Sequence, residues 1–268
     1  MMPHLRVLVR APVALAWTLG VPWWLRVRGF LLFRRWRNRR ATDLISLWAR
    51  GLAWIMGVRV VCRNPRPEPM GEVIVANHLG FLDVPVLGWF FPAVFIIKME
   101  MRRVFYFGSA LQAQGHVFVD RGSSDSRRTA RDGVRQVLED GDRIIVFPEG
   151  GASAEAVRPP FKPFCFHEAA RQNKLVQACV IDYLPHRSML RWDVTRPMLP
   201  QLVETFGRRR TEVSLEFFPA ERIEDPDAAA RRYHDLIERK LLEYDREAGL
   251  PGRAQPDSED AHAPRQVA

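Results

Sequence analysis

Residues 73–83 read Val73-Ile74-Val75-Ala76-Asn77-His78-Leu79-Gly80-Phe81-Leu82-Asp83, and this stretch decides the fold of the chain. It begins as an apolar, β-branched run of the kind that forms a buried strand. Asn77 and Gly80 then interrupt the run and favour a turn. The strand therefore delivers His78 to the edge of a sheet, where the chain has to reverse its direction.

Asp83 follows His78 by five residues, whereas neighbours on one face of a helix are three or four residues apart. The two side chains can meet only if His78 ends the strand and Asp83 lies in the first turn after a tight loop, which Gly80 allows. The carboxylate would then hold the imidazole in one tautomer and leave the other ring nitrogen free to take a proton. The competing interpretation is a histidine that only satisfies a hydrogen bond at a strand edge, because a single H-x-x-x-x-D match is common.

Composition narrows the class of partner. The chain has 268 residues, an apolar fraction of 47% and a formal net charge of +9, most of it from arginine. This length accommodates one large folded domain or two small ones. A basic balance favours phosphate-bearing partners, namely nucleic acid, anionic lipid or a phosphorylated substrate. The three cysteines are widely spaced, which indicates neither a disulfide framework nor a zinc site, and no metal site is expected.

The first 50 residues carry ten arginines, five tryptophans and one acidic residue, Asp43. The uncharged stretch from Ala11 to Leu25 is shorter than the roughly 20 residues that a spanning helix needs. Short apolar helices edged with tryptophan and arginine are typical of segments that lie in one leaflet of an anionic membrane. A cleavable signal peptide, a single tilted span from about residue 12 to about residue 33, and a soluble helical hairpin are the alternatives.

From Val58 onward, short apolar segments alternate with helical ones. Strands are predicted over 58–63, 72–76, 94–98, 116–120, 143–147, 176–183 and 212–218. Helices are predicted over 83–89, 101–112, 124–139, 163–173, 197–206 and 225–246. This alternation predicts an α/β fold: a mostly parallel central sheet flanked by helices, with an N-terminal pair of membrane-associated helices.

The predicted domain organisation has three parts. Residues 1–57 form the basic, Trp-rich, membrane-associated helices, residues 58–249 form the α/β domain, and residues 250–268 form a disordered tail. The tail is rich in Pro, Asp, Gln and Ala and has no apolar period, so it has nothing to bury in a core.

Three strand ends carry polar side chains that suit chemistry. Asn77 and His78 follow the first strand, Arg121 follows a second in Gly115-His116-Val117-Phe118-Val119-Asp120-Arg121, and Glu149 follows a third in Phe147-Pro148-Glu149-Gly150. Ligands of parallel sheets gather beyond the carboxyl ends of the strands. Taken singly, Arg121 could be a solvated loop arginine and Glu149 a helix-start acid, but the three together predict one functional rim.

These motifs resemble the glycerol-phosphate acyltransferase superfamily, in particular its 1-acyl-glycerol-3-phosphate (lysophosphatidate) acyltransferase branch. The N-H-x-x-x-x-D block of that family is present as NHLGFLD, the G-x-x-F-[IV]-D-R block as GHVFVDR and the F-P-E-G block as FPEG, in the family's order and spacing. The resemblance covers roughly Val58 to Phe218. The chain departs from the family where Gly151-Ala152-Ser153 replaces T-R-S, and a fourth, proline-containing block is not evident near Val180–Pro185. Both regions lie where the family shapes its acceptor.

The resemblance implies an acyl transfer to a lysolipid hydroxyl, which is a poor nucleophile at neutral pH. His78 would remove the hydroxyl proton as the general base, since free imidazole has a pKa of about 6.5. Asp83 would orient His78 and stabilise the imidazolium. Asn77 and nearby backbone N–H groups would steady the developing oxyanion. The acyl donor would be acyl-CoA or acyl carrier protein, with no further cofactor.

The resemblance also assigns the acceptor-binding groups. Arg121 would grip the acceptor phosphate, for which a planar guanidinium is well suited. Lys98, at another strand end, is a further phosphate candidate. Glu149 would bond the glycerol backbone or orient Arg121, and Gly150 would leave room for the acceptor. A lyso-ornithine lipid O-acyltransferase is the alternative within the same superfamily.

Partners and location follow from the same resemblance. The acceptor is a membrane lipid, so the enzyme is expected on the cytoplasmic face of the cell membrane, held as a monotopic protein or by a short N-terminal membrane segment. A catalytically silent membrane-binding protein on the same fold is the rival from another class. Nucleic acid is not expected, because arginine and tryptophan cluster with apolar helices instead of interleaving on a stacking platform.

Overall fold

The computed structural model describes residues 3–31, 37–103, 108, 111, 112, 114–120, 122–152, 159–183, 193 and 196–249. Three features that the sequence predicts lie wholly or partly outside these described residues. Arg121 and residues 250–268 lie outside the described residues, as does part of the helix expected over 101–112.

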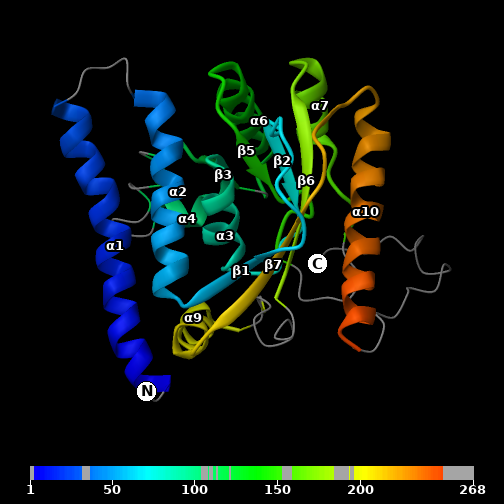
Figure 1. Cartoon of the computed structure of the whole chain (residues 1–268). Helices are drawn as coiled ribbons and strands as arrows, with labels where there is room; N and C mark the ends of the chain where they lie inside the picture. Colours follow the sequence, from blue (N-terminus) through cyan, green and yellow to red (C-terminus); the bar gives the residue numbers. More distant parts are fainter. Residues whose placement is uncertain are drawn as a thin grey trace.

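The described residues form one eight-stranded sheet. Its strands are β1 Val58–Cys62, β2 Val73–Ala76, β3 Val94–Lys98, β4 Val117–Val119, β5 Ile144–Val146, β6 Leu175–Asp182, β7 Thr211–Phe217 and β8 Glu221–Arg222. Their order is β1-β7-β6-β2-β5-β3-β4, with β8 paired to β6 (Figure 1). Strands β2 to β6 run parallel to one another, whereas β7 is antiparallel to β6 and parallel to β1. The predicted mostly parallel α/β sheet is therefore confirmed.

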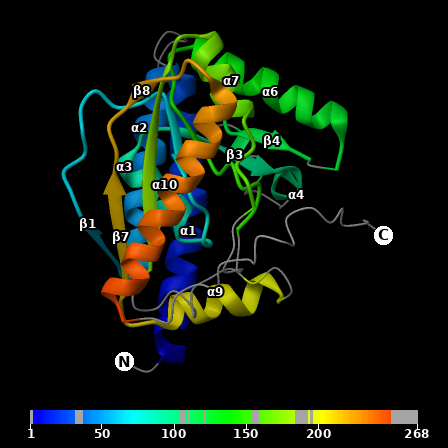
Figure 2. The same ribbon diagram turned by 90° about the vertical axis from the view of Figure 1, so that its right-hand side faces the viewer.

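Helices cover both faces of the sheet. They are α1 Pro3–Leu31, α2 Arg37–Ile55, α3 Asp83–Phe90, α4 Met99–Arg102, α6 Ser124–Glu139, α7 Phe164–Arg171, α9 Met198–Gly207 and α10 Pro226–Glu247. Helices α2 and α3 pack together on one side of the sheet, with α1 outside them, whereas α10 lies across the opposite side with α7 beside it (Figures 1 and 2). Helix α9 lies near the end of the molecule that carries the N-terminus (Figure 2).

The hydrophobic pattern explains how these elements form. Every residue of β2 is buried, which is why its sequence is a continuous apolar run. Strand β7 alternates buried and half-buried residues, as expected of a strand with one covered face. Helix α6 begins after Ser123, whose side chain accepts a hydrogen bond from the backbone N–H of Ser126 and so caps the helix.

The predicted elements agree closely with those observed. Each of the seven predicted strands is present with both ends within one residue of the prediction, and α6 spans the predicted residues 124–139. Strand β8 was not predicted, because it consists only of the charged pair Glu221 and Arg222. Its two residues form a strand only because they pair with the amino end of β6.

Tryptophan side chains lock α1 against α2. The Trp17 indole N–H donates to the Trp48 carbonyl at 3.0 Å, and the Trp48 indole N–H donates to Thr18 Oγ1 at 3.3 Å. A Cβ on Gly51 would lie 2.4 Å from the Trp17 ring, so only glycine permits this approach. Trp17 and Trp48 therefore hold the two helices together, whereas Trp23 and Trp54 are exposed.

Two arginines near the start of α1 fasten it to the α/β part of the chain. Arg10 Nη1 donates to the carbonyls of Met56, Phe206 and Arg208, and Arg6 Nε donates to the Gly207 carbonyl at 2.7 Å. These carbonyls lie at the C-terminal ends of α2 and α9, where orphan acceptors and the helix dipole both favour a cation. Arg10 thus joins three helices at one point.

We expect Arg10→Met to loosen the first half of α1, because the unbranched side chain keeps its apolar stem but loses the guanidinium. Hydrogen bonds that involve a charged group each contribute about 1.5–3 kcal/mol, so the free energy of unfolding should fall by about that amount. Urea unfolding in detergent and amide hydrogen exchange of α1 measure the effect. The control Arg59→Met removes only an exposed ion pair with Glu212 and should change stability by less than about 1 kcal/mol. Unchanged exchange of α1 in Arg10→Met would contradict the role of this clamp.

Candidate active site

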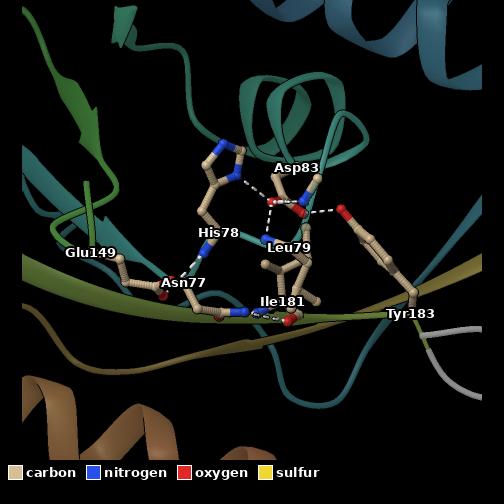
Figure 3. Close-up of polar contacts among 8 residues, drawn as sticks. Asn77, His78, Leu79, Asp83, Glu149, Ile181 and Tyr183 are labelled. Carbon is tan, nitrogen blue, oxygen red and sulfur yellow. Dashed lines mark hydrogen bonds and ion pairs between the residues drawn. The ribbon is translucent and has the colours of Figure 1, made fainter. Parts of the chain in front are cut away.

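The loop after β2 is organised by one buried carboxylate. Asp83 is the first residue of α3, and its side chain has no exposed surface. Its Oδ2 accepts hydrogen bonds from the backbone N–H groups of Leu79 and Gly80, at 2.6 and 2.9 Å (Figure 3). The side chain thus satisfies donors that the tight turn leaves without backbone partners, as short polar side chains do at turns and helix starts.

The same carboxylate binds the imidazole of His78. His78 Nδ1 lies 2.7 Å from Asp83 Oδ2. An ionised carboxylate only accepts hydrogen bonds, so Nδ1 carries the proton and Nε2 of the neutral ring has a free lone pair. The His78 side chain is 21% exposed, which leaves it accessible from solvent. The pairing expected from the sequence is confirmed, and for the expected reason: His78 follows the strand and Asp83 opens the helix.

Phe147 holds the other side of the imidazole. The two rings stack with centroids 4.1 Å apart and planes 12° apart. Phe147 directly follows β5, the neighbour of β2 in the sheet, so adjacent parallel strands place the two rings face to face. The imidazole is therefore fixed by a hydrogen bond at one edge and by an aromatic ring on one face.

Tyr183 completes the surroundings of Asp83. Its hydroxyl donates to Asp83 Oδ1, from the residue that follows β6 (Figure 3). Tyr183 is fully buried. Sequence reasoning did not select it, because a tyrosine at the end of an apolar strand carries no motif. Only the strand order, which makes β6 the other neighbour of β2, brings it to the site.

Asn77 points away from the imidazole and towards β6 (Figure 3). Its amide donates to the Ile181 carbonyl at 2.8 Å, and its amide oxygen accepts from the Ile181 N–H at 2.9 Å. The side chain is completely buried. These two bonds continue the ladder between β2 and β6 beyond the last paired residues, so Asn77 fixes the position from which His78 departs.

Glu149 and Gly150 form the turn after β5. Glu149 is buried, and its Oε1 accepts a hydrogen bond from the His78 backbone N–H at 3.3 Å (Figure 3). Gly150 has a φ of +85°, a left-handed conformation that glycine adopts without strain. A Cβ built on Gly150 would lie 2.9 Å from Lys162 Nζ. Lys162, which sequence reasoning did not assign, therefore places an ammonium group beside this turn.

One of the two expected cationic residues, Lys98, lies further along the rim. Lys98 is exposed at the end of β3 and pairs in register with Val119 of β4, the strand that leads to Arg121. Strand β3 is separated from β2 by β5. The structure thus gathers Asn77, His78, Asp83 and Glu149 at one point and sets Lys98 two strands away on the same edge, while Arg121 lies outside the described residues.

Two other side chains of potentially reactive type in the α/β part, His116 and Cys165, are buried and held in an unreactive protonation state. His116 Nδ1 accepts from the Phe95 N–H, and burial lowers the pKa of His116 to about 3, so this ring stays neutral. Burial raises the pKa of the Cys165 thiol to about 12, which leaves no thiolate for nucleophilic attack. His78 differs from both because it combines a carboxylate partner with exposure.

Comparison with known proteins places this geometry in a family. The family model described as "Acyltransferase" matches residues 57–182, from just before β1 to the end of β6. Residues 57–182 therefore form an acyltransferase-family domain. Every site residue expected from the sequence lies within the matched region, and Tyr183 is one residue beyond it.

Similar proteins include two kinds of lipid acyltransferase. A 1-acyl-sn-glycerol-3-phosphate acyltransferase of Neisseria meningitidis serogroup B is 29% identical over 148 residues, which are 55% of this chain and 56% of that protein. A lyso-ornithine lipid O-acyltransferase of Pseudomonas aeruginosa is 29% identical over 194 residues, which are 68% of this chain and 70% of that protein. The chain thus matches little more than half the length of the Neisseria protein.

The fold is shared with a solved structure. The crystal structure of the 1-acyl-sn-glycerophosphate (LPA) acyltransferase PlsC from Thermotoga maritima superposes with a TM-score of 0.68 at 20% identity, and the match covers 90% of this chain and 95% of that one. At this identity the similarity establishes the fold alone.

We predict that Asn77→Ala lowers the free energy of unfolding by about 2–4 kcal/mol, because it leaves the buried N–H and carbonyl of Ile181 without partners. Urea unfolding measures the loss. Asn64→Ala is the matched control, since Asn64 makes the same two-bond bridge to Phe217 but is only half-buried, so water replaces part of what is lost. If Asn77→Ala is as stable as wild type, Asn77 does not position β2 against β6, and direct contact with a substrate becomes the better explanation of its place in the site.

Proposed function

We propose that this chain is a membrane-associated O-acyltransferase that moves a fatty acyl group from an acyl thioester to the free hydroxyl of a lysophospholipid. The preferred acceptor is lysophosphatidate, and the product is phosphatidate. The observation that carries the proposal is the His78–Asp83 pair, in which Nδ1 is bonded to a fully buried carboxylate while the His78 side chain is 21% exposed. The donor is acyl-CoA or acyl carrier protein, and no other cofactor is needed.

The geometry supports general-base catalysis. His78 Nε2 takes the proton of the acceptor hydroxyl while its oxygen attacks the thioester carbonyl, and Asp83 stabilises the resulting imidazolium. The new C–O bond forms, the C–S bond breaks, and the proton on Nε2 passes to the departing thiolate. The ring is already held by Asp83 and Phe147, so little reorganisation precedes the reaction. No covalent acyl-enzyme is required.

Two cationic residues are assigned to a phosphate-bearing acceptor. We assign Arg121, which follows β4 in the sequence, to bidentate contact with the acceptor phosphate, and Lys98 adds an exposed ammonium at the end of β3. Glu149 bonds the glycerol backbone or orients Arg121, and Gly150 keeps the turn close to the acceptor. Asn77 supports this surface from behind, through its bonds to β6.

Lyso-ornithine lipid is the second candidate acceptor. The similarity to the Pseudomonas lyso-ornithine lipid O-acyltransferase extends over more of this chain than the similarity to the Neisseria protein. The chain also has Gly151-Ala152-Ser153 directly after the FPEG turn, where the third block of the family usually continues as T-R-S. An acceptor without a phosphate would need fewer cations at this position.

A catalytically silent membrane-binding protein is a weaker alternative. Such a protein would have no need to preserve an imidazole with a defined tautomer beside a fully buried carboxylate, because burying that charge is costly unless it is matched. Nucleic acid is not proposed as a partner, since Trp23 and Trp54, the large aromatic side chains that are exposed among the described residues, lie on the N-terminal helices α1 and α2.

Membrane association is supported by an exposed apolar surface on α1 and α9. Helix α1 is long and apolar enough to cross a membrane over Pro3–Val21, and only 6% of that stretch is buried. Its exposed apolar side chains are Leu5, Leu8, Val9, Val13 and Leu15, and α9 adds Leu199 and Val203. An apolar surface of this kind on a folded protein marks a site of interaction.

This surface lies at the same edge of the sheet as the site. Helix α9 belongs to the connection from the carboxyl end of β6 to the start of its antiparallel neighbour β7, and the first turns of α1 bond to the end of α9. His78 and Tyr183 follow strands that end at this edge. We therefore propose that α1 and α9 dock the rim on the cytoplasmic face of the cell membrane, where lysolipid acceptors reside.

The function is tested with purified protein, a labelled acyl thioester and a panel of acceptors. Lysophosphatidate should be acylated, and His78→Ala should lower kcat/KM by about 10²–10⁴-fold, the usual contribution of a general base. His167→Ala, which alters an exposed histidine on α7, is the control and should retain activity. Unchanged activity of His78→Ala would overturn the mechanism. Preference for a phosphate-free acceptor would move the assignment to lyso-ornithine lipid and remove the phosphate role of Arg121 and Lys98.

Docking is tested by placing a charge on the apolar surface. Leu8→Glu and Leu199→Glu should each weaken binding to vesicles that contain anionic phospholipid by about tenfold or more, since burying a leucine contributes about 1.5–3 kcal/mol. Vesicle flotation measures the binding. Thr129→Glu, on the exposed face of α6, adds the same charge elsewhere and should bind almost as wild type does. Equal binding of Leu199→Glu and Thr129→Glu would exclude α9 from the membrane surface.

A further inference from the structure

Asp83 shares its charge among four donors, and only one of them is the imidazole. Oδ2 accepts from His78 Nδ1 and from the backbone N–H groups of Leu79 and Gly80, and Oδ1 accepts from the Tyr183 hydroxyl. Both oxygens are fully buried, so water does not take part in this sharing. The donors that the protein supplies therefore determine how strongly the negative charge of Asp83 acts on His78.

We propose that Tyr183 is a positioning residue for His78, which holds Asp83 in place through Oδ1 and draws off part of its charge, so that the imidazole stays neutral and able to accept a proton. This inference rests on the proposed function and extends it. A carboxylate beside the ring favours the imidazolium, and it does so more strongly when fewer other donors share its charge. A general base must be neutral at the working pH and gain the carboxylate's support only as it takes the proton.

Tyr183 is suited to this task because its own proton is not lost. Burial, and then the negative charge of Asp83 beside it, raise the pKa of Tyr183 well above its usual value. The phenol is thus a donor throughout the pH range in which imidazole titrates. Its ring is buried at the end of β6, and the Tyr183 N–H donates to Asp182 Oδ1 at 2.9 Å, so the direction of the hydroxyl is fixed by the sheet.

The other charged groups around this unit come from the adjoining strands. Asp182 of β6 contributes a negative charge near Tyr183, and Glu149, after β5, accepts from the His78 backbone N–H. Both negative charges favour the imidazolium, so they act in the same direction as an unshared Asp83 would. Tyr183 and the two backbone N–H groups act in the opposite direction, which is why loss of the hydroxyl should have a visible effect.

The test is Tyr183→Phe, which keeps the ring and removes only the donor. The His78 titration midpoint, followed by NMR of protein labelled in its histidine ring carbons and assigned with His78→Ala, should rise by about one pH unit. The acid limb of kcat/KM against pH should move upward by the same amount. On the acid limb kcat/KM should therefore fall by about tenfold, while at alkaline pH it should return to within about threefold of wild type.

Tyr244→Phe is the matched control. Tyr244, on α10, is also a buried tyrosine. Its hydroxyl donates to the carboxylate of Glu216, on β7. Tyr244→Phe should lower the free energy of unfolding about as much as Tyr183→Phe does. It should leave the His78 titration midpoint and the acid limb of kcat/KM unchanged. A merely structural role for Tyr183 would make the two variants alike, with activity reduced equally at every pH.

A second variant supports the test if Tyr183→Phe folds poorly. Replacement of Tyr183 by 3,5-difluorotyrosine gives a stronger donor of nearly the same shape, so the His78 midpoint should fall instead of rising. Opposite shifts in the two variants are the expected result. An unchanged midpoint in both, or shifts of the same sign, would overturn the proposal.

The two hypotheses fail separately. If the wild-type protein acylates no lysolipid, the proposed function is wrong, but the NMR midpoints still report whether Tyr183 controls the His78–Asp83 pair. If wild type is active and the midpoint does not respond to Tyr183→Phe, the function stands and the role of Tyr183 is wrong.

Discussion

A carboxylate without access to water needs a donor for each of its lone pairs, and Asp83 obtains them from three parts of the chain. The turn after β2 supplies two backbone N–H groups, His78 supplies its ring, and β6 supplies Tyr183. Because an unmatched buried charge costs several kcal/mol, these donors have to be present together. The same requirement that fixes the turn thus fixes the tautomer and the direction of the imidazole.

The order of the strands makes that arrangement possible. Strand β2 lies between β5 and β6, so its carboxyl end has one neighbour that is followed by Phe147 and Glu149 and another that is followed by Tyr183. Parallel pairing brings all three ends to one edge. Asn77 then ties β2 to β6 just before His78 departs. The rim is therefore a product of the sheet as much as of any motif.

The N-terminal helices are part of the same construction. Arg10 joins the start of α1 to the ends of α2 and α9, and α9 belongs to the connection that leaves the site edge after Tyr183. The exposed apolar surface on α1 and α9 is consequently held at a fixed place relative to His78. In the proposed acyl transfer to a membrane lysolipid, such a coupling sets the depth at which the acceptor hydroxyl meets the base.

The sequence by itself determined the elements and the pairing of His78 with Asp83. Both are local: hydrophobic periodicity marks strands and helices, and a five-residue spacing across a turn leaves few ways for two side chains to meet. It did not reveal Tyr183, the inward bonds of Asn77 or the cation-to-carbonyl bonds of Arg10. Those depend on which strands and helices become neighbours, and that is decided by packing among residues a hundred or more positions apart. Contacts of that range leave no periodic signal in one sequence, so only the tertiary structure could supply them.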